Sequence, residues 1–173
     1  RGLGDVYKRQ SKTLNYLTEH GITEYDVLSE RAETIAADFE AVSTSIKQME
    51  HRMEQIAALK THIINYAKTR DTYVAYRKTK AADKPAFHTA HEADLLLHEA
   101  AKRAFDAQGV KKLPTVKVLQ TEYADLLTKK KAAYEDYKRL RKENQELQAV
   151  KSNVDTLLRI EEEHQEKKQE QNR

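Results

Sequence analysis

Three histidines in the middle of the chain are the residues that could bind a metal ion. His91, Asp94 and His98 are three and four residues apart, so they would share one flank of a helix. His91-Glu92 lacks the second histidine of the zinc-protease motif His-Glu-x-x-His, and the chain has no cysteine. We therefore expect His88, His91 and His98 to face solvent on an alanine-rich helix, with no metal and no other cofactor.

Patterns of catalytic residues are absent from the sequence. It has no phosphate-binding loop, no serine or cysteine nucleophile with a histidine partner, and no close carboxylate pair in a plausible cleft. Long helices joined as a hairpin would also offer no pocket for such chemistry. The sequence predicts a chain that is not an enzyme.

Basic residues are concentrated in two stretches of the chain. Residues 60–80 contain six Lys or Arg and one acidic residue, and residues 102–142 contain twelve and five. Such residues could neutralise several DNA phosphates, in binding that is salt-sensitive and poor in sequence information. They could equally keep an exposed coiled coil soluble. The candidate DNA-binding residues are Lys68, Arg70, Arg77, Lys78, Lys129, Lys130, Lys131, Arg139, Arg141 and Lys142.

The stretch from Thr23 to about Lys80 reads as one long helix. From Leu28 to Ile56 its apolar residues recur at alternating steps of three and four, which is a heptad seam. Beyond Ile56 the apolar stripe widens, so we expect more than one neighbour there. The seam residues are Leu28, Ala32, Ile35, Phe39, Val42, Ile46, Met49, Met53 and Ile56, continued by Leu59, Ile63, Tyr66 and Tyr73.

A second long helix follows Pro114, and its seam runs from Leu119 to Leu158 with Lys130, Asn144 and Lys151 as polar interruptions. Between the two long helices we expect one helix over 84–108, closed by a glycine and packed through an alanine-rich face. That face comprises Ala86, Ala90, Ala93, Leu97, Ala100, Ala101 and Ala104.

These elements predict an all-α fold, an elongated antiparallel helical hairpin (coiled-coil stalk) with a small three-helix head. The pairing that we expect places Tyr73 near Leu119 and Ile35 near Leu158. The predicted segments are a non-native or disordered leader (1–10), a short linking helix (11–22), the hairpin (23–160) with the inserted helix 84–108, and a frayed polar tail (161–173). The leader resembles translated sequencing-adapter sequence.

Six tyrosines lie in the basic regions, where nucleic-acid bases could stack on them. Tyr66, Tyr73, Tyr123 and Tyr137 are on the seams, so we expect them in the core. Tyr76 and Tyr134 remain as candidate stacking residues.

Several segments resemble the C-terminal helical region of the relaxase/mobilization nucleases of Gram-positive conjugative and mobilizable elements. These segments are TLNYLTEHGIT (13–23), THIINYAKTRDTYVAYRK (61–78), LLLHEAAKRAFDAQGVKKLPTVKVLQTEYADLLTKKKAAYEDYKRLR (95–141) and KSNVDTLL (151–158). The family's nuclease domain, with its tyrosine nucleophile and histidine-bound metal, has no counterpart here. No catalytic residue is therefore carried over.

We expect the hairpin to bring the two basic stretches together into a basic head. The resemblance implies a non-catalytic accessory tail of a relaxase, which aids DNA holding or relaxosome assembly through this head. Its partners would be DNA and the proteins of the relaxosome or the secretion machinery. The alternative is a structural coiled-coil module that binds proteins and no nucleic acid. We expect a cytoplasmic chain, which the absence of cysteine suits, and a monomer or a coiled-coil dimer. We expect no membrane contact, because no apolar run is long enough to span a bilayer.

Overall fold

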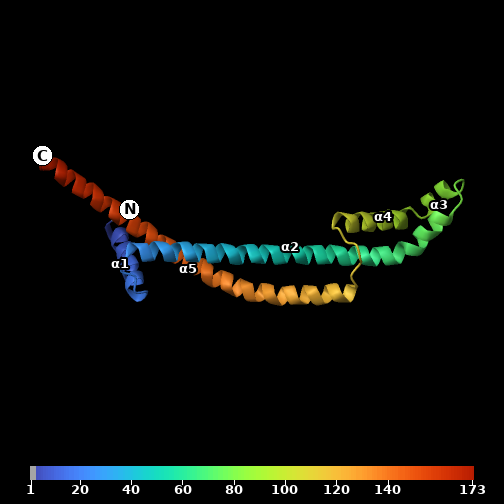
Figure 1. Cartoon of the computed structure of the whole chain (residues 1–173), viewed down its shortest axis with the longest axis horizontal. Coiled ribbons are helices and arrows are strands. Elements are labelled where there is room, and N and C mark those ends of the chain that lie inside the picture. Colours follow the sequence, from blue (N-terminus) through green and yellow to red (C-terminus); the bar gives the residue numbers. More distant parts are fainter. Residues whose placement is uncertain (1–2) are drawn as a thin grey trace. The chain divides into compact units, whose positions relative to one another are not determined.

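The chain is all-α, as predicted. A computed structural model describes residues 3–173, and this part contains five helices and no strand (Figure 1). Residues 1 and 2, which belong to the predicted leader, lie outside the described residues. The helices are α1 (Leu3–Glu19), α2 (Tyr25–Lys78), α3 (Lys84–Ala90), α4 (Glu92–Ala107) and α5 (Val116–Gln171).

The chain divides into two compact units. Unit 1 comprises Arg1–Ile46 and Ala132–Arg173, and unit 2 comprises Lys47–Lys131. The two long helices contribute to both units, and in each of them α2 packs against α5.

Unit 1 has a core that α1, α2 and α5 share. Leu28 and Ala32 of α2 are buried together with Leu147 and Val150 of α5, and Leu17 of α1 packs against them. The helices α2 and α5 run antiparallel here. Two hydrogen bonds define their pairing: Tyr25 bonds to Asp155, and Gln148 donates to the carbonyl of Ala32.

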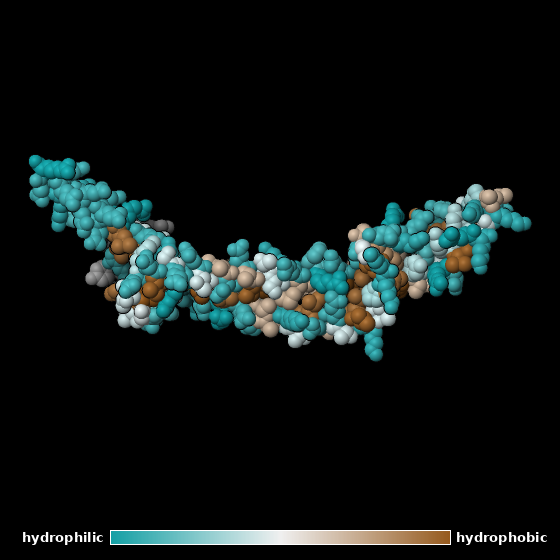
Figure 2. Space-filling model, viewed as in Figure 1, coloured by the Kyte–Doolittle hydropathy of each residue, from teal (hydrophilic) through white to brown (hydrophobic). Residues whose placement is uncertain are grey.

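Unit 2 joins α2, α4 and α5 around a second core, so the predicted three-helix packing is present. The buried side chains come from all three helices, and hydrophobic residues gather over this junction in Figure 2. They are Ile56 and Leu59 of α2, Ala101 and Phe105 of α4, and Leu119 of α5. A bidentate ion pair between Arg52 and Glu122, at 2.7 and 3.0 Å, links α2 to α5 beside this core.

The heptad seam of α2 is confirmed. None of its residues from Leu28 to Ile56 is exposed, because α5 covers this stripe within the same chain. The seam of α5 is confirmed in most positions, although Tyr123 and Leu158 are 38% and 42% exposed.

The predicted register between the two long helices is wrong. Leu119 shares a buried cluster with Ile56 and Leu59 instead of lying near Tyr73. The cause is α4, which folds back along α2, so that Tyr73 stacks on His98 and α5 begins beside Leu59. Ile35 likewise packs in the cluster of Leu147 and not beside Leu158.

The predicted helix 84–108 is two helices, α3 and α4, with a break at His91. The predicted alanine-rich face is packed only in its last part: Ala101 is buried and Ala100 and Ala104 are half-buried, whereas the earlier residues are exposed. The exposed residues are Ala86, Ala90, Ala93 and Leu97. The buried face of α4 is formed by larger side chains, which bury more apolar area than alanine does. These side chains are Leu95, His98 and Phe105, with Ala101 between them.

Gly109 closes α4 as predicted, and Gly21 closes α1 in the same way. Gly21 and Gly109 have φ of 62° and 64°, the left-handed conformation that glycine adopts at helix ends. The residue after each one donates back to the helix. Ile22 N–H donates to the Leu17 carbonyl and Val110 N–H to the Phe105 carbonyl, both at 2.9 Å.

The ends of the chain are more helical than the sequence indicated. Helix α1 begins at Leu3, so residues 3–10 of the leader continue into the linking helix 11–22. At the other end, α5 extends to Gln171 through the polar tail, where Glu163 and Lys167 have the spacing of a helix-stabilising pair.

His98 is buried in unit 2, so the prediction that it faces solvent is wrong. Its ring lies between Tyr66 and Tyr73, with ring centroids 4.6 and 4.2 Å away. Thr69 donates its hydroxyl proton to the Asn65 carbonyl, so its oxygen accepts from Nδ1–H of His98 at 3.1 Å. Burial lowers the pKa of His98, and the charge of Lys102 lowers it further.

Replacing a core residue of unit 2 tests the register. Ile56→Ala should lower the free energy of unfolding by about 2–5 kcal/mol in urea denaturation, because Ile56 is fully buried. The control Leu158→Ala should cost less than about 0.5 kcal/mol, since Leu158 is exposed. A loss at Leu158 as large as the loss at Ile56 would support the register expected from the sequence.

Acid should destabilise unit 2 through His98. Because its folded pKa is lowered, the unfolded chain takes up the proton first as the pH falls through about 6.5. Stability is then complete above that pH and decreases below it, by at most about 1.4 kcal/mol per pH unit. We expect urea unfolding between pH 7.5 and 5.5 to show this decrease, and His98→Phe to reduce it. An unchanged pH dependence in His98→Phe would contradict the assignment.

Candidate nucleic-acid interface

The candidate DNA-binding residues are divided between the two units. Arg139, Arg141 and Lys142 belong to unit 1, and the other seven belong to unit 2. Within unit 2 they form two further groups, one on α2 from Lys68 to Lys78 and one on α5 from Lys129 to Lys131.

These two groups of unit 2 lie far apart along α2. Lys130 contacts Glu50 at 3.2 Å. The α5 group therefore lies beside the first residues of α2 that belong to unit 2, which starts at Lys47. The α2 group begins eighteen residues after Glu50, about 27 Å further along the helix axis. The sequence-based expectation that the two basic stretches fold together is therefore wrong for these residues.

Acidic partners already accompany several of the cations on α5. Lys129 contacts Asp125 at 2.9 Å, Lys130 contacts Glu50, and Arg139 lies 3.5 Å from Glu143. These pairs are largely exposed and add little stability, but each carboxylate offsets a positive charge that a phosphate would need.

The cations on the end of α2 differ in this respect. Lys68, Arg70, Arg77 and Lys78 are all exposed, and none forms an ion pair with the residues that the structure describes. Lys131, Arg141 and Lys142 on α5 are also exposed and unpaired among the described residues, but the α2 group is the only predicted group in which no cation has an acidic partner.

The heptad pattern explains why Arg70 and Arg77 are exposed. One heptad position of α2 recurs every seven residues. It is isoleucine at Ile56 and Ile63, and arginine at Arg70 and Arg77. Ile56 and Ile63 lie in the core beside the start of α5, whereas α2 continues beyond that point without α5. We name Arg70, Arg77 and the adjacent Lys78 the cationic face. The change from isoleucine to arginine is the sequence signal that could have located it.

The tyrosines divide as predicted, with one exception. Tyr66 and Tyr73 are half-buried against His98, and Tyr137 packs on Phe39 at 5.1 Å. Tyr123 is exposed instead of buried.

The two candidate stacking residues have different surroundings. Tyr134 is half exposed in unit 1, with Lys138 Nζ 5.4 Å from its ring centroid. Tyr76, at the end of α2, contacts Phe87 and carries Lys84 Nζ at 5.4 Å over its ring. Sequence reasoning did not connect Phe87 with Tyr76, because their contact depends on the turn between α2 and α3.

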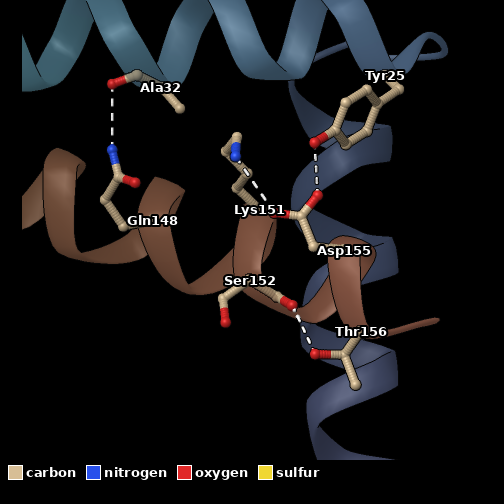
Figure 3. A network of polar contacts seen from close by, with 7 residues as sticks. All are labelled: Tyr25, Ala32, Gln148, Lys151, Ser152, Asp155 and Thr156. Atoms are coloured by element: carbon tan, nitrogen blue, oxygen red, sulfur yellow. Dashed lines mark hydrogen bonds and ion pairs between the residues drawn. The ribbon is translucent and has the colours of Figure 1, made fainter. Parts of the chain in front are cut away.

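A polar network in unit 1 fixes the start of α2 to α5 (Figure 3). The Tyr25 hydroxyl donates to Asp155 at 2.6 Å, and Lys151 contacts the same carboxylate at 3.2 Å. The first bond raises the pKa of Tyr25 and lowers that of Asp155. A phenol held neutral is a poor nucleophile and a stabilised carboxylate is a weak base, so this network suits a structural role. A shallow groove of about 430 Å³ beside it is lined by Gln148, Lys151, Ser152, Asp155, Thr156 and Arg159.

The described residues contain neither a candidate metal cluster nor a candidate membrane span. Within residues 3–173, no three His, Cys, Asp or Glu side chains come together in a way that could hold a metal ion. In the same part of the chain, no helix has both the length and the apolarity needed to cross a bilayer.

Comparison with known proteins gives no relative of this chain. No protein-family model, curated protein or solved structure matches it.

Proposed function

We propose that this chain is a non-catalytic accessory segment of a conjugative relaxase that holds DNA through the phosphate backbone. The observation that carries the proposal is the cationic face, whose exposed side chains have no carboxylate partner among the described residues. The resemblance of residues 61–78 to the relaxase tails covers this same segment. In the cell, the segment would work in the cytoplasm beside relaxosome or secretion-machinery proteins.

Arginines on one helix face suit the phosphate backbone. Arg70 and Arg77 are seven residues apart, so their attachment points are about 10 Å apart along α2. Each guanidinium can donate two parallel hydrogen bonds to one phosphate. Contacts of this kind position a nucleic acid without reading its sequence. The proposal therefore concerns DNA holding and leaves recognition of the transfer origin to other parts of a relaxase.

The second candidate function is a structural coiled-coil module that binds a protein partner. One observation favours it: Leu96 and Leu97 of α4 are 50% and 42% exposed. The heptad seam is not free for this purpose, because α5 covers it within the chain. Sedimentation separates the candidates, since a monomer agrees with DNA holding and a dimer at micromolar concentration favours the interaction module.

Reversing the charge of the cationic face should weaken DNA binding. Fluorescence anisotropy of the full chain with oligonucleotides should give Arg70→Glu/Arg77→Glu an affinity at least about tenfold lower, because two phosphate contacts become repulsive. The slope of log affinity against log salt should fall by about two.

The matched control is Lys129→Glu/Arg139→Glu, which changes the charge equally at cations that already have acidic partners. We expect a smaller loss of affinity there, with helicity by circular dichroism unchanged in both variants. Equal losses would mean that total charge is responsible and not the cationic face. An unmodified chain that binds no oligonucleotide at low salt would refute the proposed function.

A further inference from the structure

Three aromatic rings form a row where α2, α3 and α4 follow one another. Tyr76 lies in the last turn of α2, Phe87 lies on α3, and His91 occupies the break between α3 and α4. The centroids of Tyr76 and Phe87 are 6.0 Å apart, and those of Phe87 and His91 are 4.4 Å apart. We name these three residues the aromatic row.

The aromatic row lies outside both buried cores. Tyr76 and Phe87 are half-buried, His91 is exposed, and α3 contains no buried residue. This differs from Tyr66 and Tyr73, whose rings enclose the buried His98. Large aromatic side chains that remain at the surface together are unusual and often mark a binding site.

The helix break determines how His91 is presented. Its φ of −122° and ψ of 25° are not those of an α-helix. His91 is both the C-cap of α3 and the N-cap of α4. Its ring is tilted by 35° to that of Phe87 and is the exposed end of the row. A planar group could therefore continue the stack on the outer side of His91.

Several cations are close in sequence to the residues of the row, and one of them lies over a ring. Arg77 and Lys78 follow Tyr76 directly, and Lys84 Nζ lies 5.4 Å from the Tyr76 ring centroid. Lys80 lies between them in the turn, and the acidic residues of the same segment are Asp83 and Glu92. Residues 76–92 thus combine aromatic rings with an excess of positive charge.

We propose that the aromatic row stacks unpaired bases of a single-stranded nucleic acid whose phosphates lie along the cationic face. The inference rests on the proposed function and adds strand type to it. Aromatic rings beside a basic track are the usual means by which proteins hold single strands, because every unpaired base offers a flat face. In a duplex those faces are already covered by neighbouring bases. The row therefore selects single strands over duplexes.

The test uses the full chain and three ligands: a single strand with 2-aminopurine at one position, the duplex of the same sequence, and an abasic strand with the same number of phosphates. Stacking should quench the 2-aminopurine fluorescence. The single strand should bind at least about fivefold more tightly than the abasic strand, which corresponds to one stacked base.

Two variants remove rings with little risk to the fold. His91→Ala truncates an exposed residue, and Phe87→Leu keeps an apolar side chain on a helix that has no buried residue. Each should lower single-strand affinity at least about fivefold and abolish the quenching, with duplex affinity and salt slope unchanged. Tyr123→Leu, which replaces an exposed ring outside the aromatic row, is the control and should change nothing.

The outcomes separate the two proposals. If the variants bind the single strand as the unmodified chain does, while Arg70→Glu/Arg77→Glu loses affinity, the aromatic row only holds α3 on α2 and the inference is wrong. Equal binding of the single strand and the abasic strand overturns it as well. If the unmodified chain binds none of the three ligands, the proposed function itself fails.

Discussion

The packing of α4 along the last part of α2 is the contact on which the arrangement of unit 2 depends. The buried face of α4 is formed by Leu95, His98, Ala101 and Phe105. The His98 ring lies between the rings of Tyr66 and Tyr73 of α2. Because α4 folds back along this side of α2, the chain has returned to the level of Leu59 where α5 begins. Loss of the α4 contact would therefore change both the core and the start of the second long helix.

Local spacing predicted the elements of the fold but not their register. The heptad of α2 and the helix ends at Gly21 and Gly109 follow from residues close together in sequence. By contrast, when one helix of an antiparallel pair is shifted along the other by whole heptads, the two apolar stripes still face each other, so the heptad pattern does not determine the register. The register depends instead on where the segment after Gly109 returns to α2, and that depends on how α4 packs.

The same limitation explains the errors on α4. Small residues at helical spacing suggested a face for close packing, yet the larger Leu95 and Phe105 on another face remove more apolar surface from water. His98 belongs to that face. A histidine on a polar, alanine-rich helix is usually exposed. Here its burial depends on residues of α2, the two tyrosines that enclose the ring and Thr69, which accepts its N–H.

Charge counts along the sequence located the basic regions but could not tell which cations are available. Lys130 is offset by Glu50, a residue of the other long helix eighty positions earlier. Arg70 and Arg77 are available for a related reason: they hold the heptad position that Ile56 and Ile63 use for the core, at a level of α2 that α5 does not reach. An arginine at that position would be costly under α5, where its charge would lose water without gaining a partner. The register set by α4 therefore makes arginine tolerable at this position and leaves it open to an anion.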